Sequence, residues 1–130
     1  MIKLPKPDRH GAVTVETALR HRRSGRDYSG RALGLSLLSQ LLWAAQGITN
    51  RRGDRTAPSA GALFPLELYV AAGEVEDLPT GVYKYRPRGH QLTEHATGDV
   101  RSELATYAWR QSWVKAAPAI IVITLSLIHI

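Results

Sequence analysis

Arg22, Ser24 and Arg26 place three side chains that can bind an anion at every second position of one short segment. In an extended stretch all three would point to one side, where two guanidinium groups and a hydroxyl could surround one phosphate. Because arginine near a helix C-terminus is favourable in itself, the cluster also fits a solvated basic helix end. Both interpretations stay open on these residues alone.

A second segment, from Pro58 to Pro65, is poor in large side chains and bounded by two prolines. Directly after the first proline come four small residues, Ser59, Ala60, Gly61 and Ala62. Small residues let a flat ring lie close to the main chain, whose N–H groups can then reach polar atoms at the ring edge. The alternative is an ordinary turn that leads into a strand.

Other kinds of chemistry have little support. The five histidines show no metal-ligand spacing, and neither a G-x-G-x-x-G nor a G-x-x-x-x-G-K-[ST] phosphate loop occurs. The absence of cysteine excludes a disulfide framework, a thiolate zinc site, an iron–sulfur cluster and a catalytic thiol, and it favours a reducing cytoplasm. Four aromatic residues could stack on flat rings, although their spacing is more typical of core residues: Tyr83, Tyr85, Trp109 and Trp113.

Positive charge is concentrated in the first half of the chain. Residues 1–60 hold 11 Lys and Arg against 4 Asp and Glu, whereas residues 61–130 hold 6 against 7, within a net charge of +6. Such a field favours an anionic partner, either a phosphate-bearing small molecule or a nucleic acid. Thirteen of the 17 basic residues are arginine, which suits bidentate phosphate contacts, and a preference for arginine codons explains the excess equally well.

Two predicted helices must position the first segment. Val13–Arg23 has apolar residues at helical spacing, with Thr14 as a possible N-cap. Ser36–Gln46 is apolar on more than one face, which predicts a helix buried centrally or at a subunit interface. Ser36 can cap its start, and Gly47 stands where a left-handed residue commonly ends a helix.

The second segment leads into predicted strands. Alternation of apolar residues indicates a strand at Leu66–Ala71, and Gly81–Tyr85 with Gln91–Thr93 indicate a hairpin. The remaining expected elements are a helix over Val100–Trp113 capped by Asp99 and an apolar strand, covered on both faces, over Ala119–Leu125. This mixture predicts an α+β fold, and 130 residues with 44% hydrophobic side chains fit one domain with its own core.

No membrane segment is predicted. The N-terminus lacks the apolar run of a secretory signal. The most apolar stretch, Ala116–Ile130, is interrupted by Pro118 and is shorter than the roughly 20 residues that span a bilayer.

Three strings of the sequence, taken in order, resemble one known family. They are Arg22–Tyr28 (RRSGRDY), Leu38–Ile48 (LSQLLWAAQGI) and Arg55–Val70 (RTAPSAGALFPLELYV). Together they closely resemble the nitroreductase-like FMN flavoproteins, and within them the SagB-type dehydrogenase branch, which includes the azoline oxidases of thiazole- and oxazole-modified peptide biosynthesis. The resemblance continues through Gly81–Tyr85 and Trp113–Ile123 and covers nearly the whole chain.

The resemblance implies cofactor-binding roles for both segments. The Arg-x-Ser-x-Arg motif of the family holds the phosphate and ribityl end of FMN, which carries over onto Arg22, Ser24 and Arg26, with Arg23 adjacent through its backbone. The Pro-Ser-x-Gly segment of the family lies by the isoalloxazine ring, which carries over onto four residues: Pro58, Ser59, Ala60 and Gly61.

The sequence departs from the family pattern in three respects. Phe64 stands where this branch commonly has tyrosine. Ala62 stands where other nitroreductases often have a flavin-binding asparagine, which suggests that main-chain groups replace that side chain. The family fold continues beyond the strand at Ala119–Ile123, so residues 1–130 are expected to be a truncated single domain that is family-like to about residue 124, with residues 125–130 a non-native ending.

The resemblance implies an FMN-dependent oxidoreductase with a nitroreductase-like fold, a homodimer whose flavins lie at the interface. Such a protein either reduces small molecules with a nicotinamide donor, NAD(P)H, or oxidises azoline rings in a peptide substrate. The acid and base residues of the azoline chemistry lie beyond the matched part, so no catalytic residue is predicted. The alternatives are a basic nucleic-acid-binding module that uses the arginines as phosphate contacts, or an inactive fragment.

Overall fold

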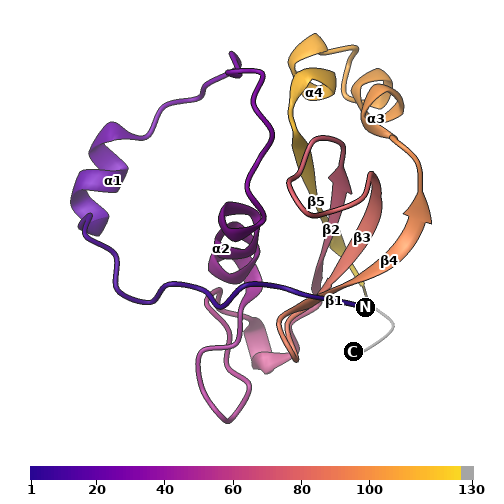
Figure 1. Cartoon of the computed structure of the whole chain (residues 1–130). Coiled ribbons are helices and arrows are strands. Elements are labelled where there is room, and N and C mark those ends of the chain that lie inside the picture. Colours follow the sequence, from indigo (N-terminus) through magenta and orange to yellow (C-terminus); the bar gives the residue numbers. More distant parts are fainter. Residues whose placement is uncertain (127–130) are drawn as a thin grey trace.

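The computed structural model of the chain describes residues 1–126. Its elements, in chain order, are β1 (Ile2–Lys3), α1 (Val15–His21), α2 (Leu35–Gln46), the 3-10 turn η1 (Ala60–Ala62), β2 (Leu66–Ala72), β3 (Gly81–Arg86), β4 (Gln91–Thr97), α3 (Arg101–Tyr107), α4 (Ser112–Ala116) and β5 (Ala119–Leu125). The strands form one sheet in the order β1-β4-β3-β2-β5, and all neighbouring strands are antiparallel (Figure 1). The predicted α+β class, the hairpin and the apolar strands are confirmed.

The core lies between α2 and one face of the sheet. Alternation along β2 buries Leu68 and Val70 on this face, and Leu38 and Leu42 of α2 are 0% exposed against them. Burial of one such leucine stabilises the fold by roughly 1.5–3 kcal/mol. The same cluster includes the two tyrosines predicted to be core residues and several aliphatic side chains: Leu4, Ala72, Val75, Leu78, Tyr83, Tyr85 and Leu92.

The opposite face of the sheet is more polar. Lys84 on β3 forms a 2.6 Å ion pair with Glu67 on β2, and its ammonium group lies 5.4 Å from the ring centre of Tyr69. His95 on β4 meets the same ring edge-to-face at 5.4 Å. The antiparallel register places Lys84 directly opposite Tyr69, and His95 reaches the same ring from β4, on the other side of β3.

The expectation that residues 119–125 are covered on both faces is wrong. β5 pairs with β2 at an edge of the sheet. Ile123 and Leu125 are each 61% exposed, and no residue of β5 is fully buried. The apolar side chains of this strand thus lie at an edge of the sheet that the described residues do not cover. The predicted non-native ending begins at Leu125, and residues 127–130 lie outside the described residues.

The predicted single helix over residues 100–113 is also wrong, because the chain forms two short helices, α3 and α4. Trp109 and Arg110 between them have φ values of 60° and 56°, which end helical geometry. Trp109 is 92% exposed and is therefore not a core residue. Asp99 accepts a hydrogen bond from the main-chain N–H of Arg101, while Val100 occupies the N-cap position.

Both predicted caps of α2 need correction. Gly34 rather than Ser36 is the N-cap, so the helix begins one residue earlier than expected. Gly47 has an extended conformation, with φ −67° and ψ 151°, rather than a left-handed one. A Cβ at this position would overlap the Trp43 indole ring and approach the Trp43 carbonyl oxygen to 2.6 Å. Close packing against Trp43 therefore explains this glycine.

His90 links three parts of the fold. Its Nδ1 lies 2.8 Å from the Tyr85 hydroxyl, and its Nε2 lies 2.7 Å from Ser39 Oγ and 3.0 Å from the Pro5 carbonyl oxygen. Ser39 in turn donates to the same carbonyl oxygen at 2.7 Å. Burial raises the pKa of Tyr85 to about 12, so its hydroxyl stays protonated. The network joins α2 and β3 to the segment that follows β1.

Acid should weaken this network. Burial holds the pKa of His90 below its ordinary 6.5, against the opposing effect of the hydrogen bond to Pro5. The unfolded chain therefore takes up the proton first, and the free energy of unfolding, complete above about pH 6.5, should fall as the pH drops through the lowered value. His90→Gln should cost about 1–3 kcal/mol at neutral pH and reduce this pH dependence.

Urea unfolding at a series of pH values measures both effects. His10→Gln, which changes an exposed histidine, is the matched control and should keep the wild-type pH profile. An unchanged profile in the His90 variant would show that this network does not couple folding to protonation.

Candidate functional site

The first candidate segment follows α1 and is exposed. Thr14 caps α1 as predicted, since its Oγ1 accepts a hydrogen bond from the Thr17 N–H at 3.2 Å. Residues 22–29 form neither helix nor strand, and the side chains of Arg22, Ser24 and Arg26 are all exposed. The guanidinium groups of this segment are therefore accessible to a ligand.

Two of the arginines already have partners within the chain. Arg23 donates through Nη1 to the carbonyl oxygens of Arg20 and Arg22, at 3.0 and 2.8 Å. Its side chain thus occupies the end of α1, as the helix-end interpretation predicts. The Arg26 guanidinium lies over the Trp113 ring of α4, 5.5 Å from its centre, and this cation–π contact holds the segment beside α4.

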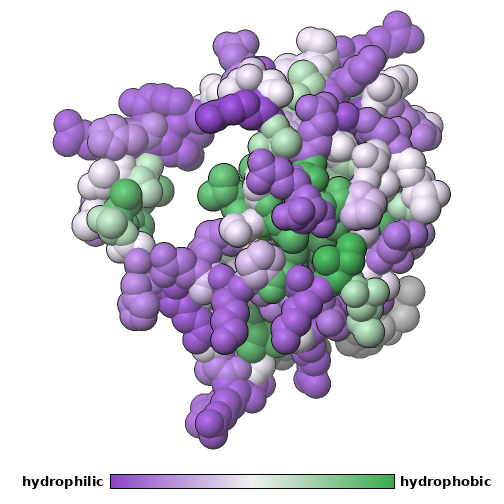
Figure 2. Space-filling view, viewed as in Figure 1, coloured by the Kyte–Doolittle hydropathy of each residue, from purple (hydrophilic) through white to green (hydrophobic). Residues whose placement is uncertain are grey.

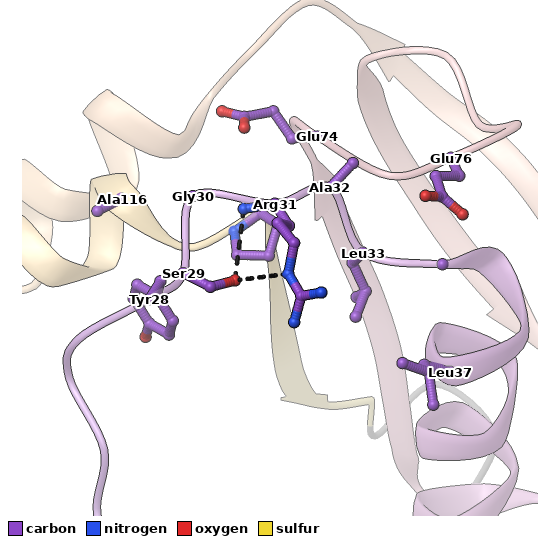
Figure 3. Close-up of a pocket in the computed structure, with 12 residues that line it drawn as sticks. Tyr28, Ser29, Gly30, Arg31, Ala32, Leu33, Leu37, Glu74, Glu76 and Ala116 are labelled. Atoms are coloured by element: carbon purple, nitrogen blue, oxygen red, sulfur yellow. Dashed lines mark hydrogen bonds between the residues drawn. The ribbon is translucent and has the colours of Figure 1, made fainter.

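A cavity of about 710 Å³ lies between residues 28–34, which follow the first candidate segment, and the loop after β2 (Figure 3). Glu74 and Glu76 bring two carboxylates to its wall, and Arg31 is bonded to Ser29 Oγ at 3.5 Å. Arg101 forms a 3.3 Å ion pair with Glu74. The two carboxylates make this cavity a poor place for a phosphate, and the anion-binding segment predicted from the sequence does not line it.

The second candidate segment contains a strained turn. Gly61, Ala62 and Phe64 have φ values of 63°, 54° and 46°, in the left-handed region that favours glycine. Ser59 Oγ accepts a hydrogen bond from the Phe64 N–H at 2.8 Å and so closes the turn. Backbone strain of this kind persists where surrounding structure enforces it, and it clusters at ligand-binding positions.

The turn leaves two main-chain donors open. The N–H groups of Ala62 and Leu63 bond to the carbonyl oxygens of Ser59 and Ala60. For the N–H groups of Ala60 and Gly61, no partner is found among the described residues. Pro58, Ser59 and Ala60 line a cavity of about 220 Å³. The open amides of Ala60 and Gly61, rather than that of Ala62, are the main-chain donors that a ligand could reach.

The two candidate segments do not meet within the chain. Figure 1 shows the stretch after α1 reaching α4, whereas η1 lies at the opposite end of the molecule, and α2 runs between them. The residues predicted to hold one cofactor are therefore separated in one copy.

The α1 helix stands away from the rest of the molecule. None of its residues is buried; Val15 and Leu19 are 70% and 69% exposed, and Val13, two residues before the helix, is 66% exposed. In Figure 2 an opening separates α1 from the rest of the molecule, and apolar side chains border this opening. A seven-residue helix has marginal stability unless its apolar side chains pack against another surface. The exposed apolar residues here are therefore available to contact a partner.

Sequence reasoning assigned no role to Arg55, although it stands just before Pro58. The structure places its guanidinium 4.9 Å from the centre of the Phe64 ring, beside the strained turn. Its charge alone does not single it out, because Arg51, Arg52 and Asp54 stand in the same loop.

Residues 1–126 contain no group of three or more His, Asp or Glu side chains arranged to hold a metal ion. Over the same part of the chain, no helix is both long and apolar enough to cross a membrane.

Comparison with known proteins agrees with this architecture. The protein MJ1384 of Methanocaldococcus jannaschii, whose name assigns it to the nitroreductases, is 41% identical over 111 residues, covering 85% of this chain and 56% of its own length. TfxC, a trifolitoxin operon protein of Rhizobium leguminosarum bv. trifolii, is 26% identical over 126 residues, covering 85% of this chain and 35% of its own length. The chain thus spans about half or less of the length of these relatives.

A solved structure from Ralstonia eutropha JMP134, also assigned to the nitroreductases, has a TM-score of 0.78 and 35% identity. It covers 94% of this chain, which corresponds to 54% of that protein. The model of the nitroreductase family matches residues 19–128 and includes both candidate segments. On this match, the chain belongs to the nitroreductase family.

Proposed function

We propose that this chain is the FMN-binding part of an oxidoreductase of the nitroreductase family. The observation that carries the proposal is the strained turn at Gly61–Phe64, inside the matched region, with two open amides beside it. Such a turn costs stability, which is best explained by a ligand that needs its main chain. Small side chains at Ala60 and Gly61 leave room for a flat ring against these amides.

The phosphate end of FMN would bind the first segment. Arg22, Ser24 and Arg26 are exposed donors, and Trp113 already orients the Arg26 guanidinium. The residues present therefore fit an anionic cofactor with a flat ring, at two separate places. Bound FMN would supply hydride transfer, while the protein fixes ring position and excludes water.

We propose that two copies of the chain complete each site. The separation of the two segments within one copy supports this arrangement, because the phosphate end and the ring could then be held by different copies. Exposed apolar residues on α1, together with Leu37 and Leu41 on the outer face of α2, which are 62% and 52% exposed, supply surface for such a homodimer.

The substrate is proposed at the level of class. One branch is azoline-to-azole oxidation in a peptide substrate by a SagB-type dehydrogenase, and the match to a protein of the trifolitoxin operon is consistent with a biosynthetic role. The other branch is reduction of small molecules with NAD(P)H as donor, in keeping with the relatives assigned to the nitroreductases. Oxidation of synthetic azoline peptides against reduction of nitroaromatics, measured with the same preparation, separates the two.

Substitution of the arginines tests the phosphate site. In a full-length version of the protein, Arg22→Ala and Arg26→Ala should each weaken FMN binding by about 1.5–3 kcal/mol, the contribution of a charge-assisted hydrogen bond. Flavin fluorescence titration measures the loss. Arg23→Ala is the matched control, because its side chain is occupied at the end of α1. Equal affinities for all three variants and the wild type would remove the assignment.

The 130-residue chain alone is predicted to be poorly soluble, to hold FMN weakly and to show no NAD(P)H-dependent flavin reduction above free FMN. The reasons are the exposed apolar edge of β5 and the single wall that one segment offers to the ring. A chimaera that adds the parts of the Methanocaldococcus relative outside the matched region should be soluble, bind FMN tightly and reduce it with NAD(P)H. A soluble 130-residue chain that reduces FMN with NAD(P)H would contradict this prediction.

A further inference from the structure

A small basic pocket lies beside the strained turn, on the side away from Pro58. It has a volume of about 270 Å³ and is lined by the turn, the end of α2, the start of β2 and the end of β3. Its charged lining consists of Arg55, Lys84, Arg86 and Glu67. Glu67 is engaged by Lys84 at 2.6 Å, so the formal charge of the lining is positive.

Arg55 is held in place without a counter-charge. Its Nη1 donates to Gln46 Oε1 at 3.2 Å, and its guanidinium stacks over Phe64. Among residues 1–126 no carboxylate lies within ion-pair distance of Arg55. A half-buried cation that has lost water and gained no carboxylate can still gain much from an anion.

The electrostatic environment agrees with this geometry. Burial lowers the pKa of the Arg55 guanidinium, with a smaller lowering from Arg88 and an opposing effect of Tyr85. An arriving oxyanion would offset both causes of the lowering. The planar guanidinium, fixed edge-on by Gln46 and face-on by Phe64, is preorganised for bidentate contact with such a group.

We propose that this pocket is a second anion subsite, which takes the phosphate or carboxylate group of a small-molecule ligand. It is separate from the exposed segment at Arg22–Arg26, and its volume is too small for a whole flavin nucleotide. Phe64 belongs to the turn proposed to lie at the flavin ring. The assignment of the anion to the substrate or electron donor, rather than to the flavin, therefore rests on the proposed function.

Thermal unfolding of the chain in its chimaeric, extended form with inorganic phosphate or acetate, against chloride at equal ionic strength, tests the subsite. Each anion should raise Tm to a plateau. In Arg55→Gln the concentration for half the effect should rise at least tenfold. Arg52→Gln removes the same charge from a nearby exposed turn and should stay within twofold of wild type. The anion that acts at lower concentration identifies a phosphate-bearing or a carboxylate-bearing ligand.

Two further variants keep the test decisive if Arg55→Gln does not fold. Arg55→Lys keeps the positive charge but loses the planar guanidinium that can make a bidentate contact. Arg86→Gln removes the charge of an exposed residue at the pocket wall. Both should weaken the anion effect severalfold. An equal Tm response in wild type, the Arg55 and Arg86 variants and the Arg52 control, or a response without a plateau, would overturn the subsite.

FMN titration of the same proteins separates this proposal from the proposed function. Arg55→Gln should keep the wild-type FMN affinity within twofold, since the residue is not assigned to the flavin. A phosphate effect that depends on Arg55 in a protein with no FMN affinity would leave the subsite standing and remove the proposed function. FMN binding without an Arg55-dependent anion effect would do the reverse.

Discussion

Packing of α2 onto the sheet is the interaction on which the rest of the structure depends. Leu38 and Leu42 are fully buried against β2, and Ser39 joins the His90 network from the same face of the helix. The end of this helix then positions the second candidate segment. Thr56 bonds through its N–H to the Gly47 carbonyl oxygen and through its hydroxyl to the Trp43 carbonyl oxygen, which fixes the loop that enters Pro58. One buried helix therefore sets the place of the strained turn and of the basic pocket.

The same helix explains why the candidate site is divided. Its 12 residues extend about 18 Å, with one segment approaching its start and the other leaving its end. Among the described residues, large apolar side chains stay exposed on α1, on the outer face of α2 and at the edge formed by β5. A fold that buries one face of each element and exposes the other is typical of a protein whose core is completed by further chain or by a partner.

Local chemistry in the sequence predicted the elements well. Thr14 caps α1 through a side-chain hydrogen bond that its position alone suggests, and alternation along residues 66–71 marks β2 correctly. Features decided by contacts distant in sequence were missed. The exposure of β5 depends on its place at the edge of the sheet, which no local pattern reveals. The break at Trp109 and the close packing of Trp43 on Gly47 were also missed, although the residues involved are near one another in sequence. For the site, the small residues at 59–62 indicate an open main chain, whereas the role of Arg55 depends on Gln46 and Phe64 meeting it in space.

Complementation between two defective variants tests most directly whether copies share the flavin site. One variant carries Arg22→Ala with Arg26→Ala, and the other carries Gly61→Val, which places a branched side chain at a φ of 63°. Each is combined with the chimaeric extension, and mixed dimers are purified through two different tags. A site shared between copies predicts that neither variant binds FMN alone while each mixed dimer binds one flavin, because one of its two sites is intact. Absence of flavin from the mixed dimers, beside wild-type dimers that bind two, would contradict the account.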